Sequence, residues 1–165
     1  DLQMANFESA RRGFEDAMVL DRAVGQWLKL ARDLLGLGQA HLFSGDYETA
    51  LGPLERSLAM ARDLGDQLTV AAANIHLGLC LAMVRDPLEG LDMVEDGYRQ
   101  AVRAGLREAE IGADLHLLRI ALVQHDDEMA SAALRRCKMH RARSRTPLFD
   151  RIFGELETRA GPFLQ

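Results

Sequence analysis

Residues 43–66 read FSGDYETALGPLERSLAMARDLGD, and this stretch decides the fold. A three-residue break, Gly45-Asp46-Tyr47, separates two runs that are rich in leucine. The leucines on the two sides of the break recur at the spacing of one helix face: Leu30, Leu34, Leu35 and Leu37 before it, and Leu51, Leu54 and Leu58 after it. The stretch therefore predicts two helices joined by a tight turn.

The composition sets the broad class of protein. The chain has 165 residues, of which 48% are hydrophobic and 27% are charged, as in a soluble domain with one hydrophobic core. The net charge of −5 provides no global basic field for nucleic acid. No apolar run reaches the roughly 18 residues of a membrane span, and no signal-peptide pattern opens the chain. We therefore expect neither a nucleic-acid partner nor a membrane.

The cysteines and basic residues indicate a compartment and a source. Cys80 and Cys137 are the only cysteines, too few for a disulfide framework, so we expect small buried side chains in a reducing cytoplasm. Basic residues are almost all arginine, with Lys29 and Lys138 the only lysines, which favours a GC-rich, bacterial genome. The chain begins with Asp1, and we expect it to be part of a longer array.

The break recurs with a period of forty residues. Residues of helix N-cap type stand at four positions in this phase: Asn6, Asp46, Asp86 and Asp126. Glycines at the same period close the predicted helices, as residues after a helix C-terminus often do: Gly25, Gly65 and Gly105. Each repeat is therefore predicted to hold a helix, a tight turn, a second helix and a glycine-closed turn.

The predicted helices follow from this phase. First helices are expected at 26–43, 66–84 and 106–124, and second helices at 6–23, 46–63, 86–104 and 126–143. Each second helix reads small, large, small on one face, as at Ala50, Leu54 and Ser57, which lets a neighbouring helix approach closely. Thr146 and Pro147 predict the start of a last helix, whose apolar stripe would cap the final repeat.

This register resembles the tetratricopeptide repeat, most clearly in residues 31–64. That copy carries the Leu37-Gly38 pair, the Gly45-Asp46-Tyr47 turn, Ala50 and Ser57. The forty-residue period resembles the long-helix variety found in large bacterial signalling ATPases and transcriptional activators. The sequence departs from the pattern at Leu118, where glycine is usual, at His41, where an aromatic is usual, and at Arg145, which breaks the glycine series.

The resemblance covers about residues 5–143 and implies an all-α fold. The expected architecture is a right-handed superhelix of antiparallel helix pairs, an α-solenoid of about eight helices. The expected parts of this single domain are a truncated N-terminal repeat at 1–24, repeats at 25–64, 65–104 and 105–145, and a capping helix at 146–165.

Nothing in the sequence has the pattern of a catalytic site, and we expect no enzyme activity and no cofactor. HExxH, GxSxG, Walker and CxxC motifs are absent. Gly36-Leu37-Gly38 lies inside a predicted helix and is not a phosphate loop. His76 and His116 lie one period apart, which leaves open a two-histidine metal site, but no carboxylate or cysteine stands near them at ligand spacing, so we expect no metal.

Residues 135–145, RRCKMHRARSR, form the most basic segment, with six of eleven residues Arg or Lys. One interpretation is a contact with nucleic acid, phosphate or an acidic partner. The favoured interpretation is a helix end whose basic residues complement the helix dipole, because acidic residues surround the run and no aromatics interleave with it.

The resemblance implies a concave groove lined by the first helices. Carrying over the groove positions gives a surface that is apolar with a few polar and basic residues: Arg32, Leu35, Gln39, Phe43, Ala72, Ile75, His76, Leu79, Met83, Leu115, His116, Arg119 and Val123. This surface lacks the Lys/Asn/Arg set with which chaperone-binding members hold a C-terminal carboxylate. An amphipathic helix or an extended apolar segment fits it better.

Two functions follow as expectations. The first is a non-enzymatic interaction module of a larger signalling or transcriptional regulator, which binds a protein partner or another domain of the same chain. The second is a small-ligand sensor domain of an ATP-dependent transcriptional activator, with polar groups supplied by Arg32, Gln39, His76, His116 and Arg119. A homodimer through exposed repeat ends is a further expectation.

Overall fold

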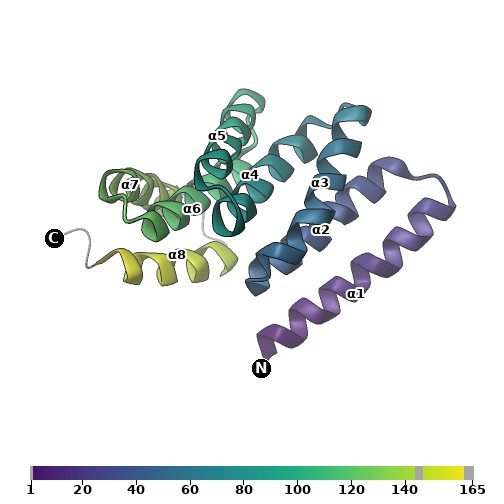
Figure 1. Ribbon diagram of the computed structural model, residues 1–165, viewed down its shortest axis with the longest axis horizontal. Helices are drawn as coiled ribbons and strands as arrows, with labels where there is room; N and C mark the ends of the chain where they lie inside the picture. The colour runs from purple at the N-terminus through teal and green to yellow at the C-terminus, as the bar shows by residue number, and fades with distance from the viewer. Residues whose placement is uncertain (1, 144–146, 162–165) are drawn as a thin grey trace.

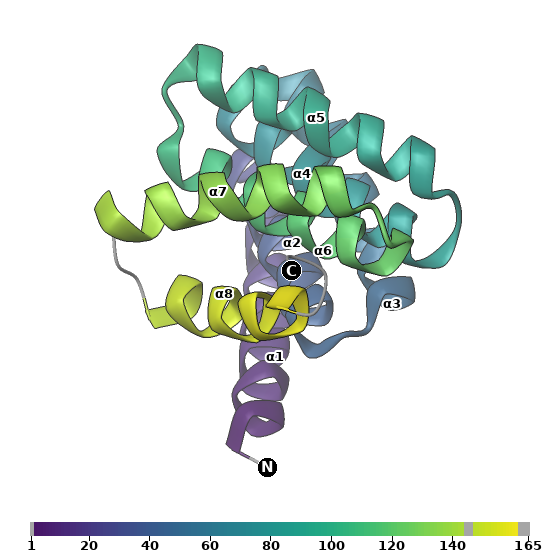
Figure 2. The same cartoon turned by 90° about the vertical axis from the view of Figure 1, so that its left-hand side faces the viewer.

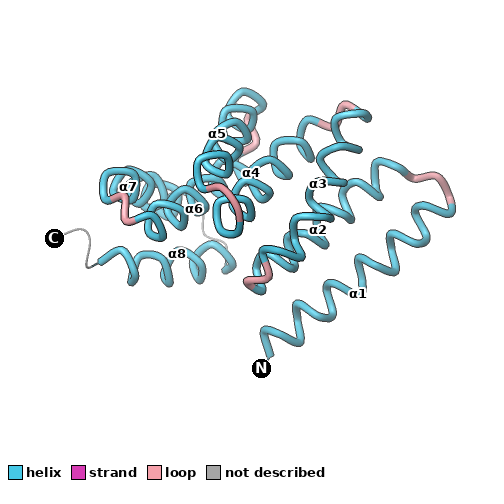
Figure 3. The backbone as a smooth tube through the Cα atoms, viewed as in Figure 1, coloured by secondary structure: helices cyan, strands magenta, loops and turns pink. Residues whose placement is uncertain are grey.

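The computed structural model describes residues 2–143 and 147–161, and within these ranges the chain forms helices and no strands (Figures 1 and 3). The helices are α1 (Leu2–Ala23), α2 (Trp27–Ser44), α3 (Tyr47–Leu64), α4 (Gln67–Val84), α5 (Pro87–Ala104), α6 (Arg107–Gln124), α7 (Asp127–Arg143) and α8 (Pro147–Ala160). The prediction of an all-α fold is confirmed. From α2 to α7, the helices begin and end within one residue of the expected positions.

Successive helices pack as antiparallel pairs that form a solenoid. Helix α2 packs on α3, α4 on α5 and α6 on α7, while the first helices of the pairs also contact one another. Helix α1 packs on α2 at one end of the stack, and α8 packs on α6 and α7 at the other end (Figures 1 and 2). The first helices therefore form an inner layer, and the second helices form an outer layer.

Three of the four predicted N-cap residues cap a second helix in the structure. Asp46 accepts a hydrogen bond from the Thr49 amide at 3.2 Å, and Asp86 and Asp126 accept equivalent bonds from the first turns of α5 and α7. The prediction for Asn6 is wrong. Helix α1 begins at Leu2, so Asn6 lies inside the helix.

Left-handed residues close the turns, as the glycine series predicts. Gly25, Gly65 and Gly105 have φ values of 71°, 70° and 67°, which a residue with a Cβ rarely adopts. Gly45 adopts the same conformation before Asp46. Arg145, where the glycine series breaks, lies outside the described residues.

Glycines inside helices bring α4 and α5 into close contact. A Cβ atom on Gly78 would lie 2.6 Å from the Gly90 carbonyl oxygen, and one on Gly97 would lie 2.6 Å from Cγ1 of Ile75. The small residues that the pattern predicts on the second helices are therefore needed most in this pair, where the backbones of α4 and α5 are in contact. Gly36 and Gly38 also lie inside a helix, where they face Phe14 and Leu54.

Helix α4 is the centre of the core. It is long and apolar enough to cross a membrane by length and composition alone, which corrects the statement that no apolar segment reaches that length. However, 72% of it is buried inside the protein, because α2, α3, α5 and α6 all pack against it. A core helix with neighbours on most sides needs little polar surface, which explains its composition.

Helix α8 covers the last pair, as the apolar stripe predicts. Phe149, Ile152, Phe153 and Leu156 are buried, and the Phe149 and Phe153 rings stack with centroids 5.5 Å apart. Thr146, the expected N-cap, lies outside the described residues, and the helix itself starts at Pro147.

Candidate functional site: the inner face of the first helices

The candidate residues divide into a surface group and a buried group. Seven are half-buried or exposed on the inner layer, where a ligand could touch them: Leu35, Gln39, Phe43, Ala72, Met83, Arg119 and Val123. Ile75 and Leu79 are only 1% and 0% exposed and belong to the core, and Leu115 is buried as well. His76 and His116 are buried as well, at 8% and 4% exposure. The assignment of these five residues to a groove surface is therefore corrected, because neighbours surround α4 and α6 on more sides than the inner-layer position suggests.

Arg32 lies at the edge of this face. Its Nε donates to Oδ2 of Asp66, the N-cap residue of α4, at 3.0 Å. The same carboxylate oxygen accepts a bond from the Thr69 hydroxyl at 2.6 Å. Arg32 is thus already paired with a carboxylate and fixes α2 to the start of α4.

A chain of hydrogen bonds crosses the three first helices beneath the surface. Gln39 Nε2 lies 2.8 Å from His76 Nε2, and His76 Nδ1 lies 2.9 Å from His116 Nε2. An amide NH₂ only donates, so the Gln39 bond makes His76 Nε2 an acceptor and leaves Nδ1–H to donate to His116. The bonds therefore run in one direction from α2 through α4 to α6, with both imidazoles neutral.

Burial keeps these imidazoles neutral. It lowers the pKa of His76 to about 4. The pKa of His116 lies well below its usual value because of burial and, secondarily, the positive charges of a protonated His76 and of Arg119. The Phe43 ring meets the His76 ring edge-on at 6.1 Å, which links the polar chain to the apolar surface above it. Among the described residues, no group of three His, Cys, Asp or Glu side chains could hold a metal ion.

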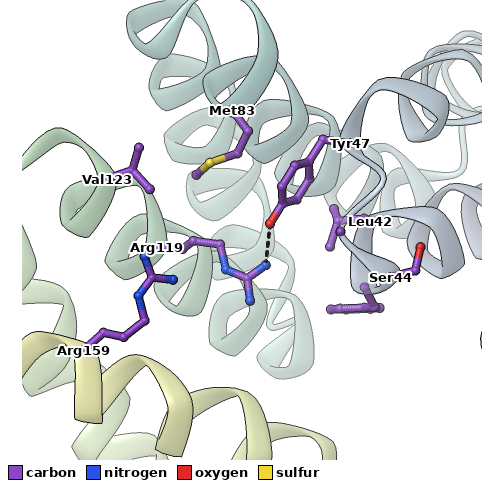
Figure 4. A pocket seen from close by; sticks show the side chains of 9 residues that line it. Leu42, Ser44, Tyr47, Met83, Arg119, Val123 and Arg159 are labelled. Atoms are coloured by element: carbon purple, nitrogen blue, oxygen red, sulfur yellow. Dashed lines mark hydrogen bonds between the residues drawn. The ribbon is translucent and has the colours of Figure 1, made fainter. Parts of the chain in front are cut away.

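A pocket opens beside this chain, between the C-terminal ends of the first helices and α8 (Figure 4). Its volume is about 380 Å³, and its lining combines apolar side chains with two arginines: Leu42, Phe43, Ser44, Gly45, Tyr47, Met83, Arg119, Val123 and Arg159. Four of these, Phe43, Met83, Arg119 and Val123, were candidates from the sequence. The structure therefore brings part of the predicted groove together in one concave place.

Sequence reasoning missed Tyr47 and Arg159. Tyr47 looked like a turn residue, yet its hydroxyl accepts a hydrogen bond from Arg119 Nη1 at 3.2 Å across 72 residues of sequence. Arg159 looked like a basic residue in the last turn of a capping helix. No local signal in the sequence indicates either role, because both residues line a pocket whose other side chains come from helices distant in sequence.

Three of the six Arg and Lys side chains of the basic segment form ion pairs within the protein. Arg136 and His140 both bond the carboxylate of Asp114, which is 0% exposed on α6. Arg141 and Lys138 form ion pairs with Glu157 of α8, at 3.4 and 3.3 Å. These contacts fix α7 to its neighbours. They also reduce the charge that this segment could offer to an external anion.

Comparison with known proteins adds one finding. Residues 2–63 match the tetratricopeptide repeat family. The match spans α1, α2 and nearly all of α3, and it supports a tetratricopeptide repeat domain in this chain. No curated protein matches the chain significantly. Tetratricopeptide repeats generally mediate protein–protein interactions and are typically non-catalytic.

Proposed function

We propose that this chain is a non-enzymatic interaction module that binds an apolar or amphipathic peptide or helix along the inner face of α2, α4 and α6. The observation that carries the proposal is that the half-buried Phe43 and Met83 and the exposed Val123 line one pocket of about 380 Å³. A concave site of this size that combines apolar side chains with polar groups can hold part of a bound segment and orient it.

The wider setting belongs to the same proposal. The module is part of a larger cytoplasmic regulator in a bacterium, acting in signalling or transcription. Its partner is another protein or another domain of the same full-length chain. The resemblance to the long-helix variety of tetratricopeptide repeat supports this setting.

Selection of displayed random peptides on the purified chain tests the proposal. We expect enrichment of peptides with apolar residues at helical spacing, and we expect Phe43→Ala combined with Met83→Ala to abolish it. The matched control is Leu88→Ala with Val102→Ala, which removes two apolar side chains that are 71% and 49% exposed on the outer helix α5. Equal loss in both variants, or no enrichment on the unaltered chain, would refute the inner face as the binding surface.

A second candidate is a small-ligand sensor. The Gln39–His76–His116 chain beside Arg119 favours it, because polar groups next to an apolar pocket can orient a small molecule. A metabolite bound to the folded state would raise the melting temperature. A screen of cell-extract fractions that shifts the melting temperature of the unaltered chain but not of an Arg119→Gln variant would support this candidate over the first.

A further inference from the structure

Two of the side chains that line the pocket are arginines. Arg119 from α6 and Arg159 from α8 reach into the same space (Figure 4). Neither guanidinium forms an ion pair with any carboxylate whose side chain the structure describes. Arg32, Arg136 and Arg141 differ in this respect, because each contacts an aspartate.

Hydrogen-bond donors remain available in the pocket on both arginines and on Tyr47. A guanidinium carries five N–H groups and no acceptor, and Arg119 uses one of them on Tyr47. Because the Tyr47 oxygen accepts that bond, its own proton is left to donate. The Ser44 hydroxyl already donates to the His41 carbonyl at 2.7 Å, and the Gly45 amide donates to the Leu42 carbonyl at 3.0 Å.

Two guanidiniums and a phenol, beside the apolar side chains of the pocket, match an anion with planar oxygens. Arginine binds carboxylates through paired N–H groups, and such charge-assisted bonds are stronger than bonds between neutral groups. Phe43 and Met83 belong both to the pocket and to the apolar inner face. A partner segment whose carboxylate lies in the pocket would therefore place its neighbouring residues on the apolar inner face.

We infer that this pocket binds the carboxylate of an acidic residue in an otherwise apolar partner segment. The inference rests on the proposed function and specifies the chemistry of the partner. It also gives α8 a second role, because the helix that covers the last pair supplies one of the two arginines. The site uses an outer-helix tyrosine and a C-terminal arginine, which are not positions of the chaperone-tail set.

Peptide selection on the arginine variant is the test. On the unaltered chain we expect enrichment of Asp or Glu flanked by apolar residues. On Arg119→Gln with Arg159→Gln we expect the acidic preference to disappear while the apolar preference remains. The matched control is Arg62→Gln with Arg103→Gln, which removes two exposed arginines from the last turns of α3 and α5 and should keep the acidic preference.

Affinity measurements then give the size of the effect. We expect a selected peptide to bind about 10- to 100-fold more weakly when its acidic residue becomes Gln or Asn, as for the loss of a charged hydrogen bond. Arg159→Gln alone should weaken the acidic peptide but not its amide version. This single variant breaks no described contact, so it remains informative if Arg119→Gln impairs folding.

The other outcomes overturn the inference in distinguishable ways. Enriched peptides without an acidic preference would overturn the carboxylate site and leave the proposed function standing. No enriched peptide on the unaltered chain would overturn both. A rise in melting temperature with inorganic phosphate at matched ionic strength, lost in Arg159→Gln and without any acidic preference among peptides, would assign the pocket to a small anion instead.

Discussion

At the scale of single residues, the buried histidines are the most distinctive feature of the inner face. His76 and His116 are 8% and 4% exposed, and the His76 Nδ1 bond to His116 requires that at least one of the two facing nitrogens lack a proton. Doubly protonated imidazoles in this place would lose that bond and repel each other. The folded state therefore holds both rings in the neutral form.

This arrangement makes stability depend on pH. The pKa of His76 is about 4 in the folded protein against 6.5 in the unfolded chain, so the unfolded chain binds more protons between these values. The contribution of the neutral His76 ring to the free energy of unfolding is fully present above pH 6.5 and is lost as the pH falls toward 4. His76 alone accounts for about 3 kcal/mol over this range, at roughly 1.4 kcal/mol per pH unit.

Urea denaturation of the unaltered chain and of a His76→Gln, His116→Gln variant measures this effect. The carboxylates titrate in both proteins, so the difference between the two pH profiles isolates the histidines. We expect the free energy of unfolding to fall less steeply in the variant between pH 6.5 and pH 4. Parallel profiles would show that the histidines are not held neutral by burial.

The same scale shows what could be predicted from sequence. Asp46, Asp86 and Asp126 were identified as caps because capping depends on residues only two or three positions away. The burial of Ile75 and Leu79 was missed because it depends on how four helices, α2, α3, α5 and α6, pack around α4. Interactions between residues close in sequence could thus be predicted, whereas the burial of a single side chain could not.

At the scale of helices, close approach of α4 and α5 depends on Gly90. A Cβ at this position would collide with the Ala82 amide nitrogen and the Gly78 carbonyl oxygen, which are backbone atoms and cannot rotate away. Gly112 in α6 has no atom within 4 Å of such a Cβ. The two glycines are both helical and differ only in what surrounds them.

Alanine substitution should therefore have opposite effects at the two sites. We expect Gly90→Ala to destabilise the protein by about 1 to 3 kcal/mol, because overpacking outweighs the gain in helix propensity. Gly112→Ala should be neutral or stabilise the protein by up to about 1 kcal/mol. Urea denaturation monitored by circular dichroism gives both values, and a stabilised Gly90→Ala variant would contradict the close packing of α4 and α5.

Helix positions were predicted well because cap and turn residues recur every forty positions. The exception is α1, where the phase placed a cap at Asn6 but the helix extends back to Leu2. The pocket could not be predicted in the same way. Tyr47 and Arg119 lie 72 residues apart, and Arg159 comes from a helix outside the repeats.

At the scale of the whole molecule, support for the helices is uneven along the solenoid. Helix α4 packs against α2, α3, α5 and α6, whereas the main packing of α1 is on α2 alone. In a stack of this kind each unit is stabilised mainly by its neighbours. The end of the stack at α1 should therefore open more readily than the centre.

Native-state hydrogen exchange tests this gradient. We expect the amides of α4 to exchange most slowly, through global unfolding, and those of α1 to exchange faster, through local opening. Leu79→Ala, at a side chain that is 0% exposed, should lower the protection of α4 by the full loss of about 2 to 5 kcal/mol. It should leave α1 nearly unchanged if α1 opens without disturbing α4. An equal loss of protection in both helices would instead mean that the solenoid unfolds as one cooperative unit, and that the inner face is as rigid at α2 as it is at α4.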